Sequence, residues 1–196
     1  MNRSFCNGAI VLSLCLPVSA GADEAKSTAV KGRYAVIGSV FCLNGPGGFD
    51  GSFQPINPAL SSGLVAAFEG VFTFDRGGQG TVVFRTANLS IGVAPANSSF
   101  VPNAGSADHS GPFTYKVGSD GTLTVNAFDV SATVLSGPGA GVNLVIDEIE
   151  LSGLATADGK SLTLGSTEPV VQTLTFPNAA SVNRVCDYAL VLTRLN

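Results

Sequence analysis

Apolar and polar side chains alternate along most of the chain, and no stretch beyond residue 20 shows the 3.6-residue period of an amphipathic helix. The segment PFTYKV at 112–117 is the clearest example of this alternation. Such a pattern is typical of a strand with one buried face, and the Gly/Asp-rich segments between alternating stretches indicate turns. The pattern predicts eight strands, at Lys31–Leu43, Leu64–Asp75, Gly80–Ile91, Pro112–Val117, Thr122–Leu135, Val142–Ala155, Ser161–Phe176 and Asn183–Leu195.

The connections between the predicted strands fall into two classes. The second–third, fourth–fifth and sixth–seventh connections are tight Gly/Asp turns, whereas the other four are longer, and two of these, 44–63 and 92–111, span about twenty residues. Pro169 is expected to interrupt or bulge the seventh strand, because proline cannot donate to a ladder. In an up-and-down arrangement the two classes of connection lie at opposite ends. We therefore predict an all-β fold, an eight-stranded antiparallel up-and-down closed barrel with one pinched end and one mouth under long loops.

The first 20 residues have the features of a secretory signal peptide: a basic start, an apolar segment at Ala9–Val18 and small residues before the cleavage point. Cleavage after Ala20 leaves 176 residues (196 minus 20), of which 21–30 are expected to form a flexible N-terminal segment and 31–196 a single domain. We expect the mature protein to be exported, to the periplasm or the extracellular space. Two of the four cysteines leave with the leader, so Cys42 and Cys186 are expected to form a disulfide.

The two remaining cysteines predict how the first and last strands pair. If Cys42 lies opposite Cys186 in an antiparallel pair, the numbers of facing residues sum to 228 (42 plus 186), so Tyr34 faces Arg194. We therefore expect the first and last strands to be hydrogen-bonded and disulfide-linked, with the disulfide at the mouth.

The segment Gly32-Arg33-Tyr34, together with Arg194 across the closing seam, resembles the lipocalin and calycin barrels, in which a Gly-x-Trp at the start meets a late arginine. The usual tryptophan is absent here. The resemblance implies a barrel that binds a small apolar molecule. The strand count and pattern are also similar to those of allene-oxide-cyclase barrels, although no residue of that family can be placed on this chain. An ordinary aromatic–cation contact between strands of another fold explains the same residues, and both interpretations stay open.

An eight-stranded barrel has room inside for side chains or for one small ligand. Arg85 either points inward, where it would anchor a carboxylate, or points outward into solvent. The aromatic residues either line a ligand cavity under a lid or simply pack as core. The candidate ligand-binding residues are Tyr34, Phe72, Phe74, Phe84, Arg85, Phe113 and Tyr115, and the candidate lid residues in the mouth loops are Phe49, Phe53 and Phe100.

No catalytic motif is present, and we predict no catalytic residue, no metal and no cofactor. Asp108-His109-Ser110 contains the residue types of a hydrolase triad, but immediate neighbours cannot form that relay. His109 is the only histidine and is expected in a loop, which excludes a His-based metal site and leaves it as a lone base in the mouth. Asp147, Glu148 and Glu150 suggest Ca²⁺ binding or acid–base work, although a solvated strand face is the commoner explanation.

The formal net charge is −4, from 10 basic and 14 acidic residues without a basic cluster, which argues against nucleic acid as a partner. Membrane insertion as a β-barrel is disfavoured, because the chain has no tryptophan and only three tyrosines for interfacial girdles. Three functions remain open: binding of a small apolar molecule, a cofactor-free cyclase or isomerase activity on a similar barrel, and a structural or interaction module at the cell surface. The sequence does not indicate the oligomeric state.

Overall fold

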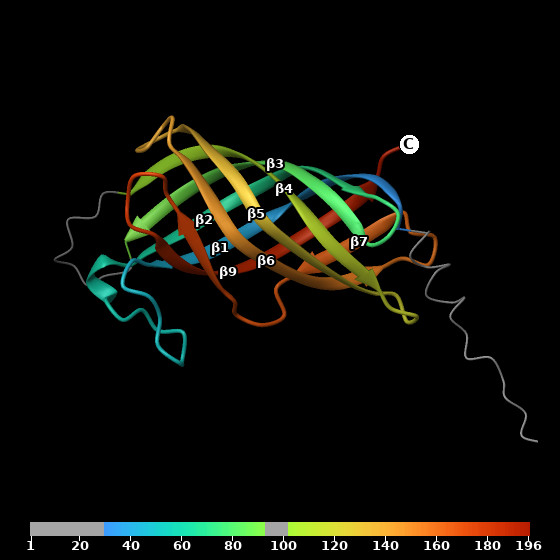
Figure 1. Ribbon diagram of the computed structural model, residues 1–196, viewed down its shortest axis with the longest axis horizontal. Coiled ribbons are helices and arrows are strands. Elements are labelled where there is room, and N and C mark those ends of the chain that lie inside the picture. The colour runs from blue at the N-terminus through green and yellow to red at the C-terminus, as the bar shows by residue number, and fades with distance from the viewer. Residues whose placement is uncertain (1–29, 93–101) are drawn as a thin grey trace, which may run out of the picture.

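The computed structural model describes residues 30–92 and 102–196, which form one antiparallel sheet (Figure 1). The predicted signal peptide, residues 21–29 of the predicted flexible segment and the lid candidate Phe100 lie outside the described residues. In the described part of the chain, no helix is long and apolar enough to cross a membrane. The strands are β1 (Gly32–Gly45), β2 (Ser62–Phe74), β3 (Gln79–Gly92), β4 (Asn103–Val117), β5 (Thr122–Ser136), β6 (Asn143–Ala155), β7 (Ser161–Gly165), β8 (Val171–Thr175) and β9 (Val182–Arg194), with a short 3-10 helix η1 (Pro58–Leu60) between β1 and β2.

The hydrogen bonds of the sheet form a ring. Strands β1 to β6 pair in chain order, β6 pairs with both β7 and β8, these two pair with β9, and β9 pairs with β1. The seam between β1 and β9 has the predicted register: Cys42 faces Cys186, Gly38 faces Leu190 and Tyr34 faces Arg194. The predicted Cys42–Cys186 disulfide is present and joins residues 144 positions apart.

The fourth strand is longer than predicted, because β4 begins at Asn103 rather than at Pro112. The expected loop at 92–111 was therefore wrong over most of its length, and His109 lies in a strand. Small or polar residues such as Gly105 and Ala107 replace the bulky apolar side chains that would have revealed an alternating pattern. Register shifts against β5 at Ser106/Ala107 and Ser110/Phe113 interrupt the period further.

The predicted seventh strand is interrupted, as Pro169 suggested. Two five-residue strands, β7 and β8, occupy one position between β6 and β9, and residues 166–170 separate them. The remaining predicted strands agree with the observed ones to within two residues at each end.

The connections sort by length between the two ends of the ring (Figure 1). The tight turns 75–78, 118–121 and 156–160 lie at the end where β1 begins and β9 ends. The longer connections, including 46–61 and 176–181, lie at the opposite end, which we call the loop end.

Aromatic side chains fill the interior at the end with the tight turns, which we call the closed end. Tyr34, Phe72, Phe74, Phe113 and Tyr115 are each at most 5% exposed. The ring centre of Phe74 lies 5.2 Å from that of Tyr34 and 5.0 Å from those of Phe113 and Tyr115. Edge-on aromatic packing at these distances adds to the stabilisation from burial alone. This half of the interior is therefore a solid core.

Candidate functional site

The interior at the loop end contains a cavity of about 390 Å³. Inward-facing residues of every strand except β7 contribute to its wall. The apolar part of the wall includes Val40, Leu64, Ala66, Phe84, Ala132 and Ile146. Polar side chains gather toward the ends of the strands at the mouth, among them Asn44, Ser62, Asn88, Ser90, Asn103 and Ser136. The arrangement suits a guest with an apolar body.

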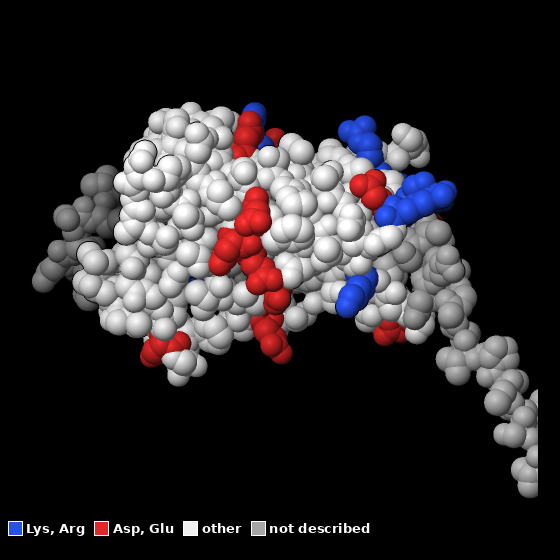
Figure 2. All heavy atoms as spheres, viewed as in Figure 1, with Lys and Arg blue, Asp and Glu red and all other residues white. Residues whose placement is uncertain are grey.

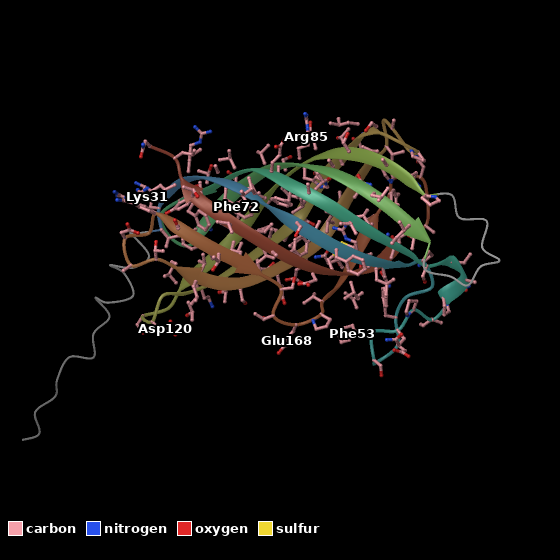
Figure 3. All side chains as sticks on the ribbon, turned by 180° about the vertical axis from the view of Figure 1, so that it is seen from behind. Lys31, Phe53, Phe72, Arg85, Asp120 and Glu168 are labelled. Atoms are coloured by element: carbon pink, nitrogen blue, oxygen red, sulfur yellow. A yellow bond between two sulfur atoms is a disulfide. The ribbon has the colours of Figure 1, made fainter. Side chains whose placement is uncertain are left out.

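The structure separates the predicted ligand-binding residues into three groups. Phe84 lines the cavity, whereas the other five aromatic candidates, Tyr34, Phe72, Phe74, Phe113 and Tyr115, form the closed-end core. Arg85 points outward and is exposed, which is the second of the two orientations considered for it (Figure 3). Its guanidinium makes two hydrogen bonds to Asp108, from Nε to Oδ1 at 2.6 Å and from Nη2 to Oδ2 at 2.8 Å.

The two described lid candidates do not line the cavity. Phe53 lies in a groove on the outer surface, beside Phe41 and Pro169 and close to Glu168 (Figure 3). Phe49 forms a backbone bridge with Pro55 within the β1–β2 connection, and its ring lies against Gly45.

A buried amide holds Arg184 in the cavity wall. The Arg184 Nε donates a 2.9 Å hydrogen bond to Oε1 of Gln172, which is its register partner on β8 and is only 2% exposed. The hydroxyl of Tyr188 lies 3.4 Å from both polar atoms of the Gln172 amide. Arg184 and Tyr188 line the cavity, and the buried side chain of Gln172 contacts both.

His109 also lines the cavity, from β4. Its ring stacks on Phe84, with 4.3 Å between ring centres and 6° between planes, and its Nε2 lies 3.1 Å from Oγ1 of Thr86. Its Nδ1 is buried and has no hydrogen-bond partner in the described part of the chain. Burial, and to a smaller degree the charge of Arg184, lowers the pKa of His109 to about 4, with Asp108 opposing the shift. The imidazole is therefore neutral near pH 7.

His109 and Arg184 project from opposite sides of the ring. Strand β4 is four pairings away from β9 in either direction, through β1, β2 and β3 or through β5, β6 and β8. The cavity wall thus carries a cation on one side and a neutral imidazole on the other.

The carboxylates of β6 lie outside the ring. Figure 2 shows acidic side chains in a band across the middle of one face, with basic ones mostly near the closed end. Oδ1 of Asp147 accepts backbone N–H groups from Glu148 at 2.8 Å and from Thr173 at 2.7 Å, and Glu150 is exposed. Among the residues that the structure describes, no group of three His, Cys, Asp or Glu side chains is placed to hold a metal ion.

The residues of the predicted lipocalin-like signature come together at the closed end. Gly32 has a φ of 122°, and the position that a Cβ would take there lies 3.5 Å from Nε of Arg194. The Tyr34 hydroxyl donates a 2.6 Å hydrogen bond to the backbone oxygen of Gly159. This cluster closes the ring and is separate from the cavity wall.

The predicted site residues do not include Arg184, Gln172, Tyr188 or Thr86. One signal was present: Arg184 and Tyr188 are each two residues from Cys186, so all three share one face of the strand. The alternation alone does not show which face of the strand points inward. No protein-family model matches the chain, and no curated protein matches it.

Proposed function

We propose that the ring is an eight-position up-and-down barrel and that the protein is an exported binding protein, which holds one small apolar molecule in the loop-end cavity. The observation that carries this proposal is the cavity itself, about 390 Å³ in volume and walled largely by apolar side chains, beside a closed end that is solid. Pockets for small molecules in proteins typically measure about 300–1,000 Å³.

Two further features support binding at this end. Cys42 is part of the cavity wall, so the disulfide holds the β1–β9 seam beside the site. The polar mouth and apolar interior match a molecule that enters with its apolar part first. The disulfide and the predicted signal peptide together support an oxidising compartment outside the cytoplasm.

A cyclase or isomerase on the same scaffold is the second candidate, and His109 is the observation that favours it. Its neutral imidazole lines the cavity, and a neutral imidazole is able to accept a proton as a general base. The two candidates differ in what happens to the bound molecule. Mass spectrometry of the small molecules that the protein retains from a bacterial extract distinguishes an unchanged ligand from a converted one.

The cavity is tested with 1-aminoanthracene, a neutral apolar probe whose fluorescence rises in an apolar site. We expect saturable one-to-one binding by the mature, disulfide-linked protein. Ala66 points into the cavity and Ala67 points to solvent, so Ala66→Phe fills the cavity whereas Ala67→Phe adds the same side chain outside. Binding should be lost in Ala66→Phe and retained in Ala67→Phe. Failure of the wild type to bind, or equal binding by a folded Ala66→Phe variant, would contradict the proposal.

A further inference from the structure

We propose that the cavity selects an amphipathic acid, a molecule with an apolar body and one carboxylate, and that Arg184 binds the carboxylate. This inference rests on the proposed binding function and specifies the chemical class of the ligand.

The charge of the cavity wall supports an acidic ligand. Among the described residues that line the cavity, Arg184 is the only Lys or Arg, and none is an Asp or Glu. Residues 93–101, which connect β3 to β4, contain no charged residue in their sequence. Among the described residues, a single positive charge therefore stands in an otherwise neutral wall, in a protein whose net charge is −4. A partly buried arginine without a counter-ion favours an anionic guest, because a carboxylate accepts two parallel hydrogen bonds from the planar guanidinium group of arginine.

The residue that holds Arg184 is neutral rather than acidic. Ion pairs in the described part of the chain join Arg85 to Asp108 and Lys160 to Asp158, both on the surface. Arg184 instead uses its Nε to bind the neutral amide of Gln172. A glutamine orients the guanidinium and leaves its charge uncompensated. A glutamate in the same place would have neutralised the charge and competed with a ligand.

The cation lies at the mouth side of the cavity. Arg184 is the third residue of β9, close to the mouth, and Tyr188 lies four residues deeper on the same strand. Phe84 and Val40 form apolar surface farther from the loop connections, because they lie eight residues (92 minus 84) and five residues (45 minus 40) before the ends of β3 and β1. The acid would lie with its carboxylate near the mouth and its apolar chain pointing toward the closed end. The neutral ring of His109, stacked on Phe84, belongs to this apolar surface.

The test compares decanoate, decanol and decylamine, which share one chain and differ in head group. Binding to the mature wild-type protein is measured by displacement of 1-aminoanthracene and by calorimetry. We expect decanoate to bind at least about tenfold more tightly than decanol, and decylamine to bind most weakly, because a charge-assisted hydrogen bond is stronger than a neutral one.

Two substitutions test whether Arg184 causes the preference for decanoate over decanol. Arg184→Gln removes the charge, and Gln172→Glu supplies an internal carboxylate to Arg184 with almost no change of shape. Both should abolish the preference, so that decanoate and decanol bind the same variant with similar affinity. Arg85→Gln and Gln79→Glu change charge on the outer surface by the same amounts and should preserve the preference. Circular dichroism confirms that each variant is folded, and the wild-type comparison of the three ligands requires no variant.

The outcomes separate this inference from the proposed function. Equal binding of decanoate and decanol by the wild type, or an unchanged preference in folded Arg184→Gln, overturns the role of Arg184 and leaves apolar binding intact. Failure of the probe and of all three ligands to bind overturns the binding function and this inference with it.

Discussion

The hydroxyl of Tyr34 donates a buried 2.6 Å hydrogen bond to the backbone oxygen of Gly159, 125 residues later in the chain. Tyr34 belongs to β1, and Gly159 lies in the turn between β6 and β7. The bond therefore ties the first strand to a turn on the far side of the β1–β9 seam, at the closed end. Burial raises the pKa of Tyr34, with the charge of Arg194 opposing the shift, so the phenol stays protonated and able to donate.

Replacing Tyr34 with Phe should lower the free energy of unfolding by about 1–3 kcal/mol, because the substitution leaves a buried carbonyl unsatisfied. The ring and its contact with Phe74 are retained, so the loss reports the hydrogen bond rather than the packing. Urea unfolding followed by circular dichroism measures the change. An unfolding midpoint equal to that of the wild type would show that water or another donor replaces the hydroxyl.

Removing the disulfide should destabilise the fold by about 2–5 kcal/mol, since the cross-link restricts the unfolded chain over a long loop. The relevant variant is Cys42→Ala with Cys186→Ala, which deletes a link across 144 positions. Urea unfolding of this variant and of the reduced wild type should give similar midpoints, both below that of the oxidised protein. Because Cys42 lines the cavity, 1-aminoanthracene binding by the variant should also weaken. Identical midpoints for oxidised and reduced protein would contradict the prediction.

Gly38 marks a point where two strands of the seam approach too closely for a side chain. A Cβ at this position would overlap the backbone oxygen of Ala189 and the side chain of Leu190 on β9. We expect Gly38→Ala to destabilise the protein by about 1–3 kcal/mol through this overlap. Gly51, in the β1–β2 connection, has no atom within 4 Å of a Cβ and provides the matched control. Thermal unfolding of Gly38→Ala and Gly51→Ala should differ clearly, and equal midpoints would show that the seam opens to accept the methyl group.

The seam was predictable because two independent constraints coincide there. Without the predicted leader, Cys42 and Cys186 are the two remaining cysteines, so they can pair only with each other. Antiparallel geometry then determines the register from Tyr34 to Gly45. The interruption at Pro169 was predictable because proline removes a hydrogen-bond donor from a strand.

The residues that line the cavity were not predictable from the same pattern. Alternation indicates which residues share a face, but it does not show whether they lie near the closed end or near the loop end. Phe74 in the closed-end core and Phe84 in the cavity wall therefore give the same signal. The polar part of the site was hidden for a related reason. His109 lies among small and polar residues whose alternation carries no hydrophobic signal, and Gln172 follows directly after the break in the seventh strand.

The pH dependence of stability should contain a contribution from His109, the only histidine in the sequence. Its pKa is about 4 in the folded protein, against 6.5 for an unperturbed histidine, because the ring is buried and near Arg184. Between these values the unfolded chain binds the proton more readily than the folded one, so stability falls as the pH drops from 6.5 toward 4. The contribution of His109 to the free energy of unfolding is fully present above the pKa that this histidine has in the unfolded chain. It amounts to about 3 kcal/mol at most.

The variant His109→Phe keeps a ring against Phe84 and removes the titration. Urea unfolding of both proteins is measured at several values between about pH 4 and pH 7.5. The free energy of unfolding of the variant is subtracted from that of the wild type, which removes the effect of the carboxylates that both proteins share. We expect the stability of the wild type relative to His109→Phe to rise through the acidic range and to level off near neutrality. An NMR titration of the His109 ring in the folded protein provides the direct value. The prediction would be contradicted if the difference in free energy of unfolding did not change with pH, or if the ring titrated near its ordinary value. Either result would show that the imidazole is in contact with water rather than buried in the cavity wall.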